Sequence, residues 1–112
     1  MNPPIYIIDG ARTPFLKARN APGPFAAGDL ATAAGSALLA RQRFAPEQLD
    51  EVILGSANQA GEDNRNVARM ATLLAGLPDS LPGYTVNRLC ASGMTAVANA
   101  SQAIRAGDAD LI

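Results

Sequence analysis

The sequence predicts an α/β layered domain with a mainly parallel sheet, built in the order β-α-β-α-β-α-β. Short apolar runs bounded by turn residues alternate with longer stretches in which apolar residues recur every three or four positions. Strands that alternate with helices are joined by crossover connections, which place them parallel. The 112 residues, of which 48% are hydrophobic, amount to one domain or slightly less.

Four short apolar runs are the predicted strands. The first ends in an Asp-Gly turn signal, and the last continues to the final residue of the sequence. The runs are residues 5–8 (IYII), 51–55 (EVILG), 84–89 (YTVNRL) and 109–112 (ADLI). Because natural chains rarely end inside a buried strand, we expect the sequence to be a truncated piece of a longer protein.

Three helices are predicted between these strands. Asp29 is expected to cap the first helix, which follows a long loop over residues 11–28 that contains three prolines. Asn64 or Asn66 is expected to cap the second helix. The third helix is Ala-rich, runs from about residue 91 to residue 106, and is closed by a glycine.

Composition and charge argue against several classes of protein. Nine basic and ten acidic residues leave a net charge of −1 with no basic patch, so neither a nucleic acid nor a membrane surface is an expected partner. No apolar run approaches the roughly 18–20 residues of a membrane span, and the N-terminus does not resemble a signal peptide. A cytoplasmic location is therefore expected. With one cysteine and no histidine, no metal site is expected.

The single cysteine, Cys90, lies where the third predicted strand meets the third predicted helix. The free N–H groups and the dipole of a helix N-terminus favour a thiolate, which is the nucleophilic form of the side chain. The same N–H groups can bind the oxyanion formed when a thiolate attacks a thioester. The alternative is an inert, buried cysteine, which is the commoner case. A catalytic cysteine also needs a base, and this chain has no histidine.

The stretch from residue 86 to residue 112, VNRLCASGMTAVANASQAIRAGDADLI, resembles the acyl-intermediate motif of the thiolases. Residues 9–15 (DGARTPF), 50–70 (DEVILGSANQAGEDNRNVARM) and 74–83 (LAGLPDSLPG) also match the family in order and spacing. The wording NQAGEDNRNVAR is most similar to degradative thiolases of the 3-oxoadipyl-CoA type. The resemblance implies a thiolase-like fold, of which residues 1–112 form the N-terminal part of a layered αβα domain with a mixed sheet. The loop domain and the C-terminal domain of the family would lie outside these residues.

The resemblance also implies an acyltransferase activity for the full-length protein. Cys90 would accept the acyl group of a 3-oxoacyl-CoA as a thioester, and its own backbone N–H would bind the thioester oxygen. Coenzyme A would act as a substrate, and no cofactor is implied. In the degradation of fatty acids or aromatic compounds the enzyme would cleave 3-oxoacyl-CoA by thiolysis, and in the opposite direction it would catalyse the Claisen condensation of acetyl-CoA. The family's catalytic histidine and second cysteine lie near its C-terminus, so residues 1–112 alone are expected to be inactive. A homodimer or homotetramer is implied.

Other residues are candidates for a subunit interface or for an acyl pocket. The subunit-interface candidates are Asn64, Arg65, Asn66, Arg69 and Asn87, and the alternative for the four in the second helix region is helix capping plus a solvated face. Met94, four residues after Cys90, is a candidate for lining the acyl pocket, with core packing as the stronger alternative.

Two other functions stay open at this point. A condensing enzyme of the ketoacyl-synthase type also places a cysteine between a strand and a helix. A non-catalytic α/β module that binds a partner through its unpaired fourth strand is the alternative from a different class.

Overall fold

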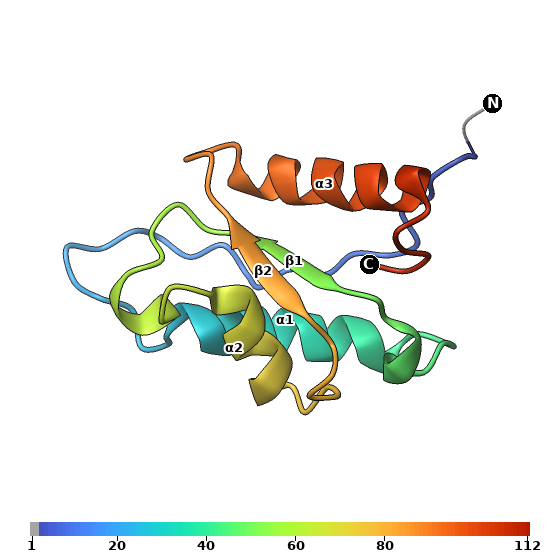
Figure 1. Cartoon of the computed structure of the whole chain (residues 1–112). Helices are drawn as coiled ribbons and strands as arrows, with labels where there is room; N and C mark the ends of the chain where they lie inside the picture. The colour runs from blue at the N-terminus through green and yellow to red at the C-terminus, as the bar shows by residue number, and fades with distance from the viewer. Residues whose placement is uncertain (1–2) are drawn as a thin grey trace.

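The computed structural model describes residues 3–112. Figure 1 shows the order of the elements along the chain. The α-helices are α1 (Ala27–Ala40), α2 (Val67–Leu74) and α3 (Ser92–Ala106), the strands are β1 (Val52–Gly55) and β2 (Gly83–Val86), and the short 3-10 turns are η1 (Pro46–Gln48) and η2 (Gly61–Asp63). The predicted second and third strands and all three predicted helices are therefore present.

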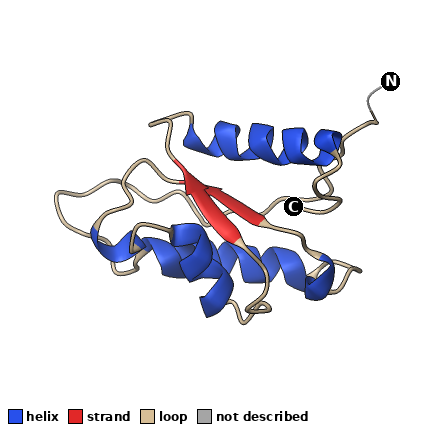
Figure 2. Cartoon of the chain, viewed as in Figure 1, coloured by secondary structure: helices blue, strands red, loops and turns tan. Residues whose placement is uncertain are grey.

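The sheet consists of β1 and β2, which pair in parallel with Val52 opposite Gly83 and Gly55 opposite Val86. Parallel neighbours need a crossover connection, and α2 provides it. Figure 2 shows α3 on one side of the two strands and α1 and α2 on the other. This arrangement of helix, sheet and helix confirms the predicted α/β layers. Because the strands are parallel, the carboxyl ends of β1 and β2 lie at the same edge of the sheet.

The predicted first and last strands do not form. Within residues 3–112, hydrogen-bonded strands are limited to β1 and β2. Tyr6, Ile7 and Ile8 are exposed, Ile7 at 84%, and Ile5 is half-buried, although the apolar run predicts burial of this segment. Residues 109–112 make one backbone bond to the chain before β1, from the Asp50 N–H to the Leu111 carbonyl at 2.9 Å. An apolar run indicates that a segment tends to be buried, but a strand also needs a partner in register, and neither segment has one here.

The third predicted strand is also shorter than expected. It was predicted to run to Leu89, whereas β2 ends at Val86. The reason is Asn87, whose Oδ1 accepts a hydrogen bond from the Leu89 N–H at 2.9 Å. Such a local side-chain bond turns the backbone away from the sheet.

The start of α1 differs from the prediction, whereas the cap of α2 agrees with one of its two alternatives. The residue that precedes α1 is Ala26, and Asp29 lies inside the first turn instead of capping it. The Ala27 N–H donates to the Glu62 carboxylate at 3.0 Å, so a distant side chain satisfies a helix-end donor that the sequence had assigned to Asp29. Asn66 caps α2, with its Oδ1 accepting from the Arg69 N–H at 3.3 Å.

The buried core is small and is made largely of small side chains. Its apolar members are Val67, Ala68, Ala71, Leu81 and Ala96. An apolar hollow of about 650 Å³ lies beside it, bounded by residues 5–9, α1, β1, α3 and residues 110–112. Among the described residues, no helix combines the length and the apolar character that crossing a membrane requires.

Candidate active site

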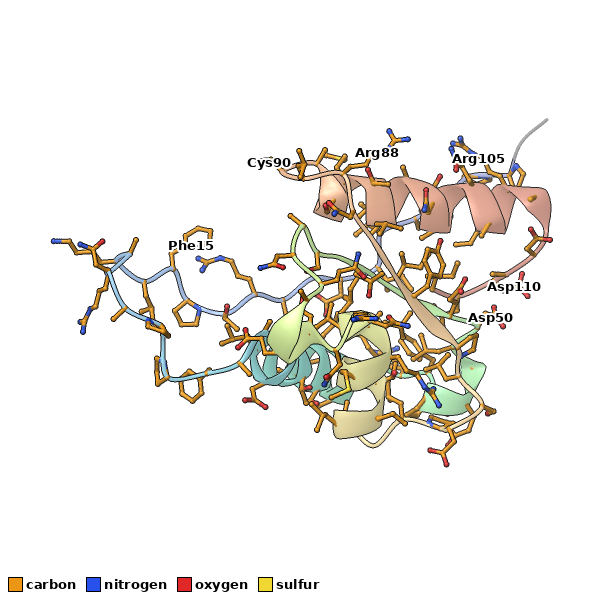
Figure 3. The ribbon with its side chains drawn as sticks, turned by 60° about the vertical axis from the view of Figure 1, so that its left-hand side comes forward. Phe15, Asp50, Arg88, Cys90, Arg105 and Asp110 are labelled. Carbon is orange, nitrogen blue, oxygen red and sulfur yellow. The ribbon has the colours of Figure 1, made fainter. Side chains whose placement is uncertain are left out.

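The turn between β2 and α3 carries Cys90 at the surface. The chain leaves the sheet at Val86 and enters α3 at Ser92, so Cys90 lies two residues before the helix. Its thiol is free and exposed in this chain, as the catalytic interpretation requires. Figure 3 shows Cys90 at the N-terminal end of α3, far from Asp50 and Asp110 near the other end of the helix.

Free backbone donors surround the start of α3. In the part of the chain that the structure describes, no protein acceptor is bonded to the N–H groups of Cys90, Gly93 or Met94, whereas those of Ala91, Ser92 and Thr95 are bonded. The first N–H groups of a helix have no partner within the helix, and the helix dipole adds partial positive charge there. This end of α3 therefore offers donors to a negatively charged or polarised oxygen beside the cysteine.

Two side chains hold the turn in shape. The Ser92 hydroxyl donates to the Leu89 carbonyl at 2.7 Å and accepts from the Arg88 N–H at 2.8 Å. Asn87 accepts from the Leu89 N–H and donates from Nδ2 to the Ala57 carbonyl at 3.2 Å. The second bond of Asn87 joins the turn to the loop that follows β1.

The loop after β1 lies beside this turn because parallel strands end at the same edge of a sheet. Its Ser56 hydroxyl donates to the buried carboxylate of Asp63 at 2.7 Å. Asn64 and Arg65 follow with positive φ angles of 48° and 66°, a conformation that few non-glycine residues adopt. Loops at the carboxyl ends of parallel strands are the usual place for ligand sites in α/β folds. Asn87 lies in the loop after β2, and Asn64 and Arg65 lie in the loop after β1. Both loops start at the edge of the sheet where the Cys90 turn begins.

Asn66 and Arg69 make their hydrogen bonds within the chain. Asn66 donates to the Gly83 carbonyl at 3.1 Å and accepts from the Thr85 hydroxyl at 2.8 Å, in addition to capping α2. The Arg69 guanidinium donates to the carbonyls of Leu81 at 2.9 Å and Asp79 at 3.1 Å. These contacts support the capping interpretation for Asn66 and give Arg69 an intramolecular anchoring role. A place for these residues in a subunit interface stays a prediction.

Met94 is 75% exposed, so it does not pack in the core that residues 3–112 form. It lies on the first turn of α3, where its side chain extends into solvent on the helix that starts next to Cys90. Its role in lining an acyl pocket stays a prediction.

Two residues of the site were missed or misread from the sequence. Gly55 ends β1, and a Cβ atom there would lie 2.5 Å from both the Gly93 nitrogen and the Ser92 carbonyl oxygen, closer than non-bonded atoms approach. Only glycine therefore lets the start of α3 rest on the end of β1. For Ser92, a serine at a helix start, the sequence favours a cap of α3 over a hydrogen bond near the sulfur, but its hydroxyl bonds backwards to residues 88 and 89 instead of to the helix N–H groups. The sequence feature that could have indicated this close contact is a glycine at the end of an apolar strand.

Charged groups with a shifted pKa lie away from the site. Hydrogen bonds from the Gly10 N–H, Gln42 and Arg41 lower the pKa of Asp9. The N–H groups of Asp110 and Leu111 lower the pKa of Asp50. Across residues 3–112, no group of three or more histidine, cysteine, aspartate or glutamate side chains is placed to hold a metal ion.

The chain matches the family described as "Thiolase, N-terminal domain" over residues 5–112. It therefore belongs to the thiolase family, and the resemblance found in the sequence motifs is confirmed. The fold described above is consistent with this assignment, since the matched range contains all of the helices and both strands.

Curated relatives narrow the similarity within the family. A "Beta-ketoadipyl-CoA thiolase" of Pseudomonas knackmussii is 56% identical over 113 residues, covering 100% of this chain and 28% of the relative. A "3-oxoadipyl-CoA/3-oxo-5,6-dehydrosuberyl-CoA thiolase" of Escherichia coli is 56% identical over 108 residues, or 96% of this chain and 27% of the relative. An "Acetyl-CoA acetyltransferase" of Allochromatium vinosum is 46% identical over 112 residues, with 100% and 28% covered. The chain thus spans little more than a quarter of the length of these relatives.

Proposed function

We propose that residues 1–112 form the N-terminal part of the N-terminal domain of a degradative thiolase that acts on 3-oxoacyl-CoA thioesters of the 3-oxoadipyl type. The observation that carries this proposal is an exposed cysteine at a strand-to-helix turn, next to free N–H groups, inside the range that matches the family. The names of the relatives favour this function over a ketoacyl-synthase-like condensing enzyme and over a non-catalytic module. The loop domain and the C-terminal domain would come from the remaining length of the enzyme.

Cys90 is the proposed acyl acceptor. Its thiolate attacks the 3-oxo carbon, a carbon–sulfur bond forms, and the bond between C2 and C3 breaks. The electron pair of that bond stays on C2 of the departing acetyl-CoA, which takes up a proton from an acid. A second coenzyme A then attacks the acyl-cysteine through its sulfur, gives its proton to a base, and releases Cys90 as the leaving group. For 3-oxoadipyl-CoA, the group held on Cys90 is a four-carbon acyl chain that ends in a carboxylate.

The backbone supplies electrostatic stabilisation for these steps. Each attack places negative charge on a carbonyl oxygen, and the Cys90 N–H is an unbonded donor beside the sulfur. Removing one such donor from an enzyme costs about a hundredfold to a thousandfold in rate. The proton transfers need a base and an acid that lie outside residues 1–112, because this chain has no histidine and no second cysteine.

The proposed partners follow from this chemistry. Coenzyme A and acyl-CoA enter as substrates, and neither a cofactor nor a metal takes part in the steps above. A homodimer or homotetramer in the cytoplasm, with Asn64, Arg65, Asn66, Arg69 and Asn87 near a subunit interface, completes the proposal. The position of Asn87 and Arg65 on neighbouring loops at one edge of the sheet supports a shared surface there.

The test is to trap the acyl-enzyme. The intact enzyme that contains this chain is mixed with a 3-oxoacyl-CoA in the absence of free coenzyme A, and the mass added to the peptide that contains Cys90 is measured. We expect the mass of the acyl group on Cys90, and a fall in thiolysis of about ten-thousandfold or more in Cys90→Ala. Acylation of another residue, or full turnover by Cys90→Ala, would contradict the proposal.

A further inference from the structure

Leu89, the residue before Cys90, has a left-handed backbone with a φ angle of 53°. A bulky side chain makes this conformation unfavourable, and it persists only where the surroundings hold it. Leu89 itself is 70% exposed, so packing of its side chain does not provide the restraint. The restraint must come from bonds to its backbone.

Both backbone polar groups of Leu89 are bonded to side chains. The Asn87 Oδ1 accepts from its N–H at 2.9 Å, and the Ser92 hydroxyl donates to its carbonyl at 2.7 Å. The same Ser92 hydroxyl accepts from the Arg88 N–H at 2.8 Å. A hydroxyl has one proton and two lone pairs, so Ser92 makes both bonds at once. The two side chains thus fix the peptide groups on each side of Leu89.

The peptide group between Leu89 and Cys90 contains the Leu89 carbonyl and the Cys90 N–H. A trans peptide is planar, and its C=O and N–H point in opposite directions. A bond that fixes the Leu89 carbonyl therefore also fixes the direction of the Cys90 N–H, the donor that the proposed reaction uses. The Ser92 N–H also bonds this carbonyl, at 3.1 Å, so the hydroxyl reinforces an existing contact.

The turn that carries Cys90 also contacts the sheet, in addition to the hydrogen bonds within the turn. Ser92 is 4% exposed, and its backbone lies against Gly55 at the end of β1. Asn87 bonds the Ala57 carbonyl in the loop that follows β1. Both residues that fix the turn are therefore anchored to β1 or to its loop, so the Cys90 N–H has a fixed direction relative to the fold.

We propose that Ser92, with Asn87, is a positioning residue for catalysis: its buried hydroxyl orients the Leu89–Cys90 peptide so that the Cys90 N–H points to the thioester oxygen. This inference rests on the proposed thiolase function. It assigns Ser92 no contact with substrate and no proton transfer, because its hydroxyl is already bonded on both sides.

The test compares acylation with alkylation of the same sulfur in the intact enzyme. Attack of the sulfur on the 3-oxo carbonyl places negative charge on an oxygen that the N–H donor binds, whereas alkylation by iodoacetamide develops no charge on a carbonyl oxygen and does not use the donor. In Ser92→Ala we expect kcat and the acylation rate to fall by about tenfold to a hundredfold, with KM and the alkylation rate within about threefold of the original enzyme. Ser92→Thr, which keeps the hydroxyl, should restore most of the lost rate.

Controls separate positioning from folding. Ser101→Ala makes the same change on the same helix, at a residue whose hydroxyl has no partner among the described residues, and it should leave kcat unchanged. Because Ser92 is buried, the exposed Asn87→Ala is a second test that removes the bond to the Leu89 N–H, and it should show the same loss of acylation without loss of alkylation.

The outcomes are distinct. Unchanged kcat in both Ser92→Ala and Asn87→Ala, or equal losses of acylation and alkylation, would overturn the positioning role. Full activity in Cys90→Ala, measured in parallel, would overturn the proposed function itself. Loss of activity in Cys90→Ala with no effect at residues 87 and 92 would overturn only the present inference.

Discussion

The two ends of the small sheet are stabilised in different ways. At the carboxyl end, the turn that carries Cys90 is held by hydrogen bonds from residues within a few positions of it and from the adjacent loop. At the other side of the layers, the apolar residues 5–8 border a hollow of about 650 Å³, and Tyr6, Ile7 and Ile8 are exposed. Their segment is tied to α1 through Asp9, whose carboxylate accepts from Arg41 at 3.0 Å and Gln42 at 2.8 Å. The turn is thus held mainly by bonds between residues close in the sequence, whereas the apolar segment is held through Asp9 by residues more than thirty positions away.

The largest expected effect concerns activity. Residues 1–112 hold the proposed nucleophile and its N–H donors but no histidine, so the isolated chain has no base of the usual kind for thiol activation. We expect no measurable thiolysis of acetoacetyl-CoA by the purified 112-residue chain. Turnover above the uncatalysed rate, abolished by Cys90→Ala, would show that the local turn suffices for catalysis.

Gly55→Ala should give the largest loss of stability. The added Cβ would lie 2.5 Å from the Ser92 carbonyl oxygen, and backbone atoms cannot move aside as a flexible side chain can. Because overpacking of this kind costs about 1–3 kcal/mol, we expect a loss near the upper end, about 3 kcal/mol, in a urea titration of the chain.

Gly35→Ala is the matched control for Gly55→Ala. Gly35 lies inside α1, and a Cβ there meets nothing within 4 Å. Alanine is the better helix former, so this variant should gain about 0.5–1 kcal/mol in the free energy of unfolding. Equal effects of the two substitutions would contradict the close contact between β1 and α3.

Asn66→Ala should cost about 2 kcal/mol. The change removes the cap of α2 and the bonds to the Gly83 carbonyl and the Thr85 hydroxyl, and a cap alone contributes about 1 kcal/mol. Gln102→Ala, on the exposed side of α3, is the control and should change stability by less than about 0.5 kcal/mol. A loss no greater than that of the control would show that the cap and the bonds of Asn66 contribute little to the stability of the chain.

The smallest expected effect is the pH dependence from Asp50. Its pKa is lowered from the ordinary value of 3.8 by the N–H groups of Asp110 and Leu111. A lowered folded-state pKa contributes stability above the unfolded value, and that contribution is lost as the pH falls through the folded value. We expect Asp50→Asn to lower the urea midpoint slightly at pH 7, with the difference from the original chain vanishing below the folded pKa.

Asp79→Asn is the control for the pH experiment. Asp79 is exposed, and its carboxylate accepts no hydrogen bond from any residue that the structure describes. Its substitution removes no hydrogen bond and should change the urea midpoint at pH 7 by less than Asp50→Asn does. A midpoint difference for Asp50→Asn that stays constant with pH would show that the 110–111 segment is not held by this carboxylate.

Elements that depend on the spacing of apolar residues were predicted correctly, whereas strands that need a neighbouring strand to pair with were not. The helices followed from apolar spacing and from glycines such as Gly107, and the parallel pair followed from two apolar runs around a helix. The runs at residues 5–8 and 109–112 have the same character, but their pairing depends on neighbours that local pattern does not specify. The place of Cys90 between strand and helix followed from the same pattern, whereas its exposure did not, because a buried cysteine stayed an open alternative.

The fine geometry of the turn was beyond prediction for a different reason. A glycine would have indicated a positive φ angle, but the residue in that conformation is Leu89. The role of Ser92 depends on that angle, since its hydroxyl reaches residues 88 and 89 only when the chain turns back on itself. Capping was the reasonable expectation for a serine at a helix start, and the strained residue before Cys90 is what makes it wrong.

At Gly55, the atoms of α3 nearest to the side-chain position are main-chain atoms of Ser92 and Gly93. Side chains change rotamer on warming, whereas a main-chain contact has no rotamers to populate. The start of α3 should consequently keep its position on β1 as long as the domain stays folded, because no change of side-chain rotamer can release this contact.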